Sequence, residues 1–205
     1  MFRARVRHLV LMHRMLLVIV LALAVGVSPG FAAPPEGKGK PPGATNGPDQ
    51  IAGTPDADQI NGKAGNDEIN GFGGNDALQG GPGDDHLYGG PGHDRLSGGP
   101  GTDVLAGDAG DDTIAGGAGV DTVLGGAGND AIAGGAGADT VLGGAGNDKI
   151  DGGPGADVLA GGEGRDVIRT RDKLKDRITC GAGRDRVIAD RGDRVARDCE
   201  VVRRG

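Results

Sequence analysis

The chain has 205 residues, enough for one domain of ordinary size, but it holds 45 glycines and only 2% aromatic residues. This composition excludes a conventional core packed from large side chains. The formal net charge is −7, so we do not expect a nucleic-acid partner, because phosphate contacts require a basic surface.

The first 33 residues differ in composition from all that follow. Four arginines precede thirteen almost purely apolar residues at 15–27, and small residues follow at Gly30, Ala32 and Ala33. A basic start, a short apolar run and a small-residue cleavage site are typical of a secretory signal peptide, whereas a membrane span needs about 20 apolar residues. We expect residues 1–33 to be removed on export, residues 34–43 to form a linker, and the mature protein to be secreted without a membrane span.

Aspartate recurs every nine residues from Asp49 to Asp166, which makes fourteen consecutive repeats. An aliphatic residue follows each aspartate by two positions, and glycine precedes it by two, except that Asp56 stands before Asp58. The unit reads G-G-x-G-x-D-x-U-x, where U is aliphatic, and GGAGNDAIA at 125–133 shows it in full. Self-similarity at a fixed short period predicts a solenoid.

The glycine and aspartate pattern also occurs, in part, in three other kinds of structure. Collagen is excluded because glycine follows a nine-residue period and not a three-residue period. An EF-hand fails because Ile60 stands at the fifth position counted from Asp56, where an oxygen ligand is needed. A metal-free solenoid, in which the aspartates only cap turns, stays open as an alternative.

The repeats resemble the RTX, or hemolysin-type calcium-binding, nonapeptide family over residues 44–169. The resemblance implies an all-β parallel β-roll, with two nonapeptides per turn, about seven turns, and each U residue pointing inward. It implies one Ca²⁺ between loop n and loop n+2, so fourteen loops give at most twelve sites. The loops at 44–52 and 53–61 depart from the pattern, which leaves these expected metal ligands: Asp67, Asp76, Asp85, Asp94, Asp103, Asp112, Asp121, Asp130, Asp139, Asp148, Asp157 and Asp166.

The loop composition favours cation binding independently of this resemblance. Glycine at three of six loop positions lets backbone carbonyls approach a ligand closely, and Ca²⁺ takes its oxygen ligands from carboxylates and carbonyls. Lys63, Phe72 and Asp108 replace the second glycine in three loops, which a carbonyl ligand tolerates. Because fourteen stacked carboxylates repel one another, we expect folding to depend on calcium and the metal-free repeats to be largely disordered.

From residue 170 the period decays, with intervals of ten, nine and eight residues leading to Asp176, Asp185 and Asp193. Residues 44–169 hold 21 acidic and 5 basic residues, whereas residues 170–205 hold 7 acidic and 11 basic residues. We expect 170–205 to form a basic cap that closes the acidic stack. Cys180 and Cys199 are about one turn apart, so they should lie about 5 Å from each other on neighbouring turns and form a disulfide.

The mature chain carries no recognisable catalytic motif. Its single serine, Ser97, lacks a G-x-S-x-G context, and neither His86 nor His93 belongs to an H-E-x-x-H zinc motif. We therefore predict a non-enzymatic, calcium-binding protein with a structural or surface role.

Positions 7 and 9 of each repeat point outward, and alternate repeats build opposite sheets. One sheet is expected to present a strip of apolar side chains that includes Val104, Leu124, Leu142 and Val158. Such a strip often marks an interaction surface, here for a second copy or a cell-surface partner, although small aliphatic residues also simply suit exposed strands. The alternative function is therefore adhesion or assembly through the face around Leu124 and Leu142, with calcium only making that face rigid.

Overall fold

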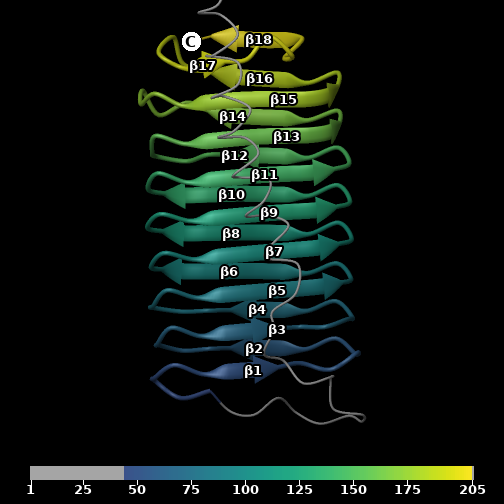
Figure 1. Ribbon diagram of the computed structural model, residues 1–205, viewed down its shortest axis with the longest axis vertical. Helices are drawn as coiled ribbons and strands as arrows, with labels where there is room; N and C mark the ends of the chain where they lie inside the picture. Colours follow the sequence, from purple (N-terminus) through teal and green to yellow (C-terminus); the bar gives the residue numbers. More distant parts are fainter. Residues whose placement is uncertain (1–43, 205) are drawn as a thin grey trace, which may run out of the picture. The chain divides into compact units, whose positions relative to one another are not determined.

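The computed structural model describes residues 44–204, which form eighteen β-strands in two nine-stranded parallel sheets (Figure 1). The expected signal peptide at 1–33 and the expected linker at 34–43 lie outside the described residues. Between residues 44 and 204 the chain has no helix, and thus no helix long and apolar enough to cross a membrane.

Odd-numbered strands make one sheet and even-numbered strands make the other, and we call these the odd sheet and the even sheet. The odd sheet contains β1 (Gln50–Ala52), β3 (Glu68–Asn70), β5 (His86–Pro91), β7 (Val104–Ala109), β9 (Thr122–Ala127), β11 (Thr140–Ala145), β13 (Val158–Gly164), β15 (Arg177–Gly183) and β17 (Arg194–Val195). The even sheet contains β2 (Gln59–Asn61), β4 (Ala77–Gln79), β6 (Arg95–Pro100), β8 (Thr113–Ala118), β10 (Ala131–Ala136), β12 (Lys149–Asp151), β14 (Val167–Thr170), β16 (Arg186–Ala189) and β18 (Val201–Arg204).

The chain crosses from one sheet to the other after every nonapeptide, so equivalent residues on neighbouring strands are eighteen apart in the sequence. Val123 on β9, for example, pairs with Val141 on β11. Strands β1 to β14 form the seven turns expected from the fourteen repeats, and β15 to β18 continue the same two sheets for two further turns. The molecule is thus an all-β parallel roll of about nine turns.

One aliphatic side chain from the centre of each repeat strand fills the narrow space between the sheets. All fourteen of these residues are at most 5% exposed, which confirms that U points inward: Ile51, Ile60, Ile69, Leu78, Leu87, Leu96, Leu105, Ile114, Val123, Ile132, Val141, Ile150, Leu159 and Ile168. Ile178 and Val187 extend this core into the carboxyl-terminal turns. The core cluster is therefore aliphatic along the repeats, includes Cys180 near its carboxyl-terminal end, and contains no aromatic residue.

The loops stack so closely that only glycine fits at the second and fourth positions of most repeats. Gly126 has φ of +114°, in the left-handed region, and a Cβ added there would lie 2.0 Å from the carbonyl oxygen of Asp108 one turn earlier. Lys63, Phe72 and Asp108 occupy the second position with φ between 71° and 79°, so they enter the same region of backbone conformation. Lys173, in the irregular loop before β15, has φ of 74°.

The carboxyl-terminal segment 170–205, expected to close the stack, carries strands β15 to β18 up to Arg204. A disulfide joins Cys180 to Cys199, with their Cα atoms 5.1 Å apart. The distance and the pairing agree with the prediction from the one-turn separation of the two cysteines.

Candidate metal centre

The twelve aspartates predicted as metal ligands lie in two columns along the roll. One column lies in the loops that lead into odd-numbered strands, and the other lies in the loops that lead into even-numbered strands. Each of the twelve is at most 2% exposed. The nine-residue period therefore brings carboxylates together in the loops and withdraws them from water.

The backbone of the preceding turn holds one oxygen of every carboxylate in these columns. The amide of Asp103 donates to Oδ1 of Asp121 at 2.9 Å, and the amide of Asp121 donates to Oδ1 of Asp139 at 2.9 Å. The same bond joins all successive members of both columns from Asp49 and Asp58 up to Asp176 and Asp185. Each column is therefore a continuous hydrogen-bonded ladder that fixes the orientation of every carboxylate.

The other oxygen, Oδ2, accepts no hydrogen bond in fourteen buried aspartates of the described chain. They are Asp67, Asp76, Asp85, Asp94, Asp103, Asp112, Asp121, Asp130, Asp139, Asp148, Asp157, Asp166, Asp176 and Asp185. A buried, charged oxygen without a partner is costly, so each of these atoms is poised for a cation or a proton.

Burial raises the pKa of the twelve predicted ligands and of Asp176, and the hydrogen bond from the preceding amide opposes that rise only in part. The pKa reaches about 7 for Asp112. It reaches about 6 for four others, Asp76, Asp103, Asp148 and Asp157. Neighbouring carboxylates in the same column raise the pKa further, because like charges disfavour the ionised form.

Most of the unpaired Oδ2 atoms in the regular repeats share a small space with a backbone carbonyl of the next turn. A Cβ added to Gly125, the first glycine of its repeat, would lie 2.4 Å from Oδ2 of Asp130 and 2.4 Å from the carbonyl oxygen of Gly143. At Gly62 the distances are 2.4 Å to Oδ2 of Asp67 and 2.7 Å to the oxygen of Gly80. The position of the added Cβ is one bond length from the glycine Cα. It therefore marks the region where the two oxygens converge and not the position of an ion. Glycine at the first position keeps this space open.

The first two loops close the same space with threonine. The amide and the hydroxyl of Thr45 both donate to Oδ2 of Asp49, at 2.6 and 2.9 Å. Thr54 does the same for Asp58, at 2.6 and 3.0 Å. These two aspartates thus have a complete set of partners within the protein. The sequence indicated weak calcium sites in these two loops because glycines are missing. The structure adds a direct reason, which is that threonine already donates hydrogen bonds to the oxygen that would bind the ion.

Two buried aspartates beyond the predicted set have the same unpaired oxygen. Asp176 and Asp185 follow the decayed intervals after residue 170, yet their Oδ1 atoms accept amide hydrogen bonds from the ladder as in the regular repeats. Their positions two residues before Ile178 and Val187 were the signal for this placement. Their loops begin with Thr170 and Cys180 where other loops begin with glycine, so a side chain stands at the position that the regular sites leave open.

The ladders end in contacts within the protein at the carboxyl terminus too. Oδ2 of Asp193 accepts hydrogen bonds from the hydroxyl of Thr170 at 2.9 Å and from the amide of Asp190 at 2.6 Å. Glu200 replaces aspartate at the end of the other ladder and accepts the amide of Asp185 at 2.9 Å. Unpaired oxygens are therefore confined to the interior of both columns.

The donor set fits a hard cation bound mainly by backbone oxygens. Among residues 44–204 no group of three or more histidine, cysteine or acidic side chains gathers at one point. Each site therefore offers carboxylate oxygen from its column and carbonyl oxygens from glycine-rich loops, with no nitrogen or sulfur ligand. All-oxygen sets of this kind suit Ca²⁺, which accepts irregular geometry more readily than Mg²⁺ does.

The serine and the two histidines considered as catalytic candidates lie in different strands and loops of the roll. Ser97 lies on β6 in the even sheet, His86 lies on β5 in the odd sheet, and His93 lies in a loop, where its Nδ1 accepts the amide of Asp111 at 2.8 Å. Within the expected apolar strip of the odd sheet, Leu124 pairs with Leu142. Val104 on β7 and Val158 on β13 stand at the other outward position of their strands, where they pair with Thr122 and Thr140.

Comparison with known protein families gives one match. The RTX calcium-binding nonapeptide repeat matches the chain in four copies, at residues 44–74, 70–105, 97–132 and 133–168. No curated protein matches the chain at a significant level.

Proposed function

Because the chain belongs to the RTX calcium-binding nonapeptide repeat family, we propose that it is a secreted, non-enzymatic protein whose folding is coupled to calcium binding. The observation that carries this proposal is the column of buried Oδ2 atoms that no protein group satisfies. Cations supply the missing partners, so the free energy of binding becomes free energy of folding.

The twelve predicted ligands, from Asp67 to Asp166, hold at most twelve ions in this proposal. Each ion takes Oδ2 of one aspartate together with backbone carbonyl oxygens of its own loop and of the loop one turn away. The convergence of Asp130 Oδ2 with the carbonyl of Gly143 supports this assignment, since these oxygens belong to adjacent turns. Asp49 and Asp58 hold no ion, because Thr45 and Thr54 already occupy their Oδ2 atoms.

Circular dichroism and calorimetric titration of the mature protein test the coupling. Chelated protein should give a coil spectrum, and calcium should convert it to a β spectrum with midpoints around 10⁻⁴ to 10⁻³ M, as in other extracellular modules. Asp121→Ala should require more calcium to fold than Asp49→Ala. A β spectrum that a strong chelator leaves unchanged at neutral pH would overturn the proposal, and equal calcium requirements of the two variants would overturn the assignment of metal-free first loops.

The repeat architecture and the expected signal peptide support a structural role at or outside the cell surface. The expected signal peptide at 1–33 supports secretion, which the amino-terminal sequence of protein recovered from culture medium tests directly. The separation of Ser97, His86 and His93 over different strands and loops supports a role without catalysis. Residues 170–205 act as the cap of the roll, held by the Cys180–Cys199 disulfide.

A second candidate function is adhesion or self-assembly through the apolar strip. The pairing of Leu124 with Leu142, between Val104 and Val158 on the flanking strands, supports it. Replacing both leucines with lysine should abolish self-association in light scattering while leaving calcium-induced folding intact. If calcium-loaded wild-type protein stays monomeric at high concentration, the strip does not bind a second copy of the chain. If the double variant binds a partner as well as wild type does, the strip is not the docking surface for that partner.

A further inference from the structure

The side chains that are exposed to solvent differ in charge from the sequence as a whole, because many acidic side chains are buried. Fifteen aspartates of the described range are buried. Between residues 44 and 164 there remain nine acidic side chains that are not buried and three basic ones. Between residues 165 and 204 there are thirteen basic side chains and only four acidic ones that are not buried. The surface of the carboxyl-terminal turns is therefore strongly basic, although the chain as a whole is acidic.

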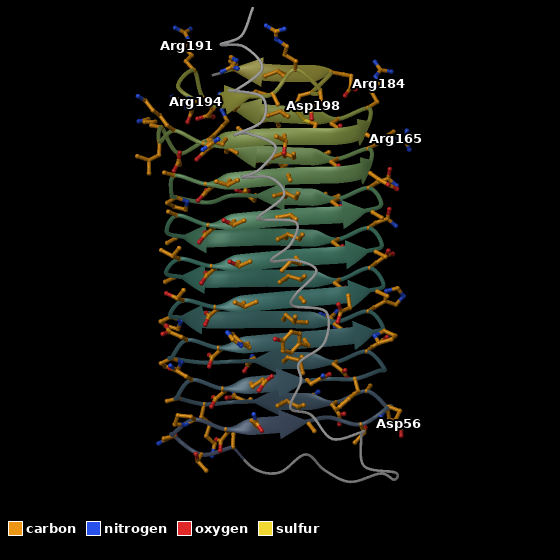
Figure 2. The ribbon with its side chains drawn as sticks, in the orientation of Figure 1. Asp56, Arg165, Arg184, Arg191, Arg194 and Asp198 are labelled. Carbon is orange, nitrogen blue, oxygen red and sulfur yellow. A yellow bond between two sulfur atoms is a disulfide. The ribbon has the colours of Figure 1, made fainter. Side chains whose placement is uncertain are left out.

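Figure 2 shows the two ends of the roll. The labelled Arg165, Arg184, Arg191 and Arg194 all lie toward the carboxyl-terminal end, where the labelled Asp198 is one of the few acidic residues that are not buried, and Asp56 lies at the amino-terminal end. These four arginines belong to loops and to the odd sheet, and a second group of cations lies on the even sheet.

The outer face of the even sheet carries one cation on each of four neighbouring strands, which we call the basic row. Its members are Lys149 on β12, Arg169 on β14, Arg186 on β16 and Arg203 on β18. Lys149 and Arg186 stand at the first outward position of their strands, and Arg169 and Arg203 stand two residues further along. Neighbouring strands are about 4.8 Å apart, so the row presents positive charge at a regular interval along the roll axis.

The basic row is free to bind a ligand. All four side chains are exposed. None of them forms a hydrogen bond or an ion pair through its side chain with another residue of the range 44–204. Asp151 is the one acidic residue on the outer face of β12, β14, β16 and β18, and it is also exposed. It stands opposite Arg169 in the strand register, so it offsets part of the charge of the row.

The row adjoins a shallow hollow of about 420 Å³ on the same face. Small side chains line one part of the hollow, among them Ala115, Ala131 and Ala133 on β8 and β10, and Thr113 adds a hydroxyl. Lys149, Arg169 and Arg186 line the other part together with one carboxylate, Asp151, so three cations outweigh one anion there. A ligand that fits must be flat enough for a shallow apolar floor and must carry negative charge at intervals close to the strand spacing.

We propose that the basic row and its hollow bind a linear acidic polysaccharide, with one carboxylate or sulfate per sugar unit. A sugar ring spans about the same length as one strand spacing, so successive acidic groups meet successive cations, and arginine forms paired hydrogen bonds with both kinds of anion. The described even sheet has no aromatic residue on which nucleic-acid bases could stack. The small alanines of the hollow offer little apolar surface for insertion into a lipid bilayer.

Isothermal titration of the calcium-loaded mature protein with soluble oligogalacturonate, and separately with sulfated dextran oligosaccharide, tests the proposal. R169Q/R186Q should weaken binding of at least one probe by about tenfold or more, which equals about 1.4 kcal/mol. The matched control R165Q/R184Q removes the same charge from exposed loop positions and should change affinity by less than about threefold. Calcium-induced folding should be the same in both variants, because these side chains have no partner within residues 44–204.

The two probes distinguish carboxylate recognition from sulfate recognition, and binding of either one at the row supports the proposal. Equal losses in the two double variants would show nonspecific attraction to the basic end and overturn it. Binding of neither probe would overturn it as well. Tighter binding of duplex DNA or of anionic vesicles, with the same dependence on Arg169 and Arg186, would assign the row to a different class of partner.

Discussion

Replacing one interior aspartate by asparagine should change the stability of the roll in opposite directions with and without calcium. In wild-type protein the Oδ1 atom of Asp103 accepts the amide of Asp85 at 2.8 Å, and its Oδ2 is buried without a partner. Asparagine keeps the Oδ1 acceptor and places an uncharged amide group where Oδ2 was. That amide can donate to the carbonyl of Gly116, which converges on the same space.

The size of the effect follows from the charge at this site. Burial raises the pKa of Asp103 from 3.8 to about 6, and each unit corresponds to about 1.4 kcal/mol, so ionised Asp103 destabilises the metal-free fold by up to about 3 kcal/mol. Partial solvation of the carboxyl group lowers this penalty to about 1–2 kcal/mol. Asp103→Asn removes this penalty in chelator. In calcium at about 100 times the dissociation constant, loss of one site costs about 2.7 kcal/mol.

The measurement is a pair of equilibrium titrations followed by circular dichroism. In chelator at pH 7.5, Asp103→Asn should fold at a lower concentration of trimethylamine oxide than wild type, because this osmolyte favours the compact state. In calcium, the same variant should unfold at a lower urea concentration than wild type. Asp49→Asn is the control, since Thr45 already satisfies its Oδ2 atom. A shift of the same sign for Asp103→Asn in both titrations would refute the reasoning.

Three further predictions follow from the loops, the buried carboxyls and the disulfide. Gly125→Ala places a Cβ 2.4 Å from two oxygens of a site and should raise the calcium midpoint in calorimetry, whereas Gly73→Ala, whose Cβ would meet nothing closer than 3.8 Å, should not. The pKa of Asp112 is raised to about 7, so its contribution to the metal-free fold is present below the unfolded pKa near 3.8 and is lost as pH rises through 7. Chelated protein should therefore gain β structure in circular dichroism between pH 8 and pH 5, and a coil spectrum throughout would contradict this. Replacing Cys180 and Cys199 with alanine should destabilise the last two turns by about 3 kcal/mol, seen as faster hydrogen exchange in β15 to β18 and not in β5 to β11.

The inward aliphatic residues and the loop aspartates could be predicted from the sequence, because the period of nine places them at the same position in every repeat. Leu105 and Val123 reach the core, and Asp103 and Asp121 reach the loops, for the same reason: each occupies a fixed place in a unit that the chain repeats fourteen times. The prediction that Cys180 lies one turn from Cys199 relied on this spacing too, and the structure confirms it.

Features that depend on atomic orientation could not be read from the period. Nothing in the spacing tells which oxygen of Asp121 accepts the amide of Asp103, so the ladder and its unpaired Oδ2 atoms emerge only from the structure. The hydrogen bonds of Thr45 to Asp49 require a particular loop conformation and not only a residue type. Asp176 was placed outside the predicted set because its interval is ten residues, yet the extra residue is absorbed in the loop and the strand register is kept.

The alternation of successive nonapeptides between two sheets restricts how such a chain can change length. Insertion or loss of one unit leaves every aspartate and aliphatic residue in a valid position, so the core tolerates any copy number. It also transfers all downstream outward residues to the opposite sheet. A nine-residue deletion between Leu124 and Leu142 would separate these neighbours onto different faces, whereas loss of eighteen residues keeps every face intact. Selection on the surface, and not on the core, should therefore favour duplications that come in pairs.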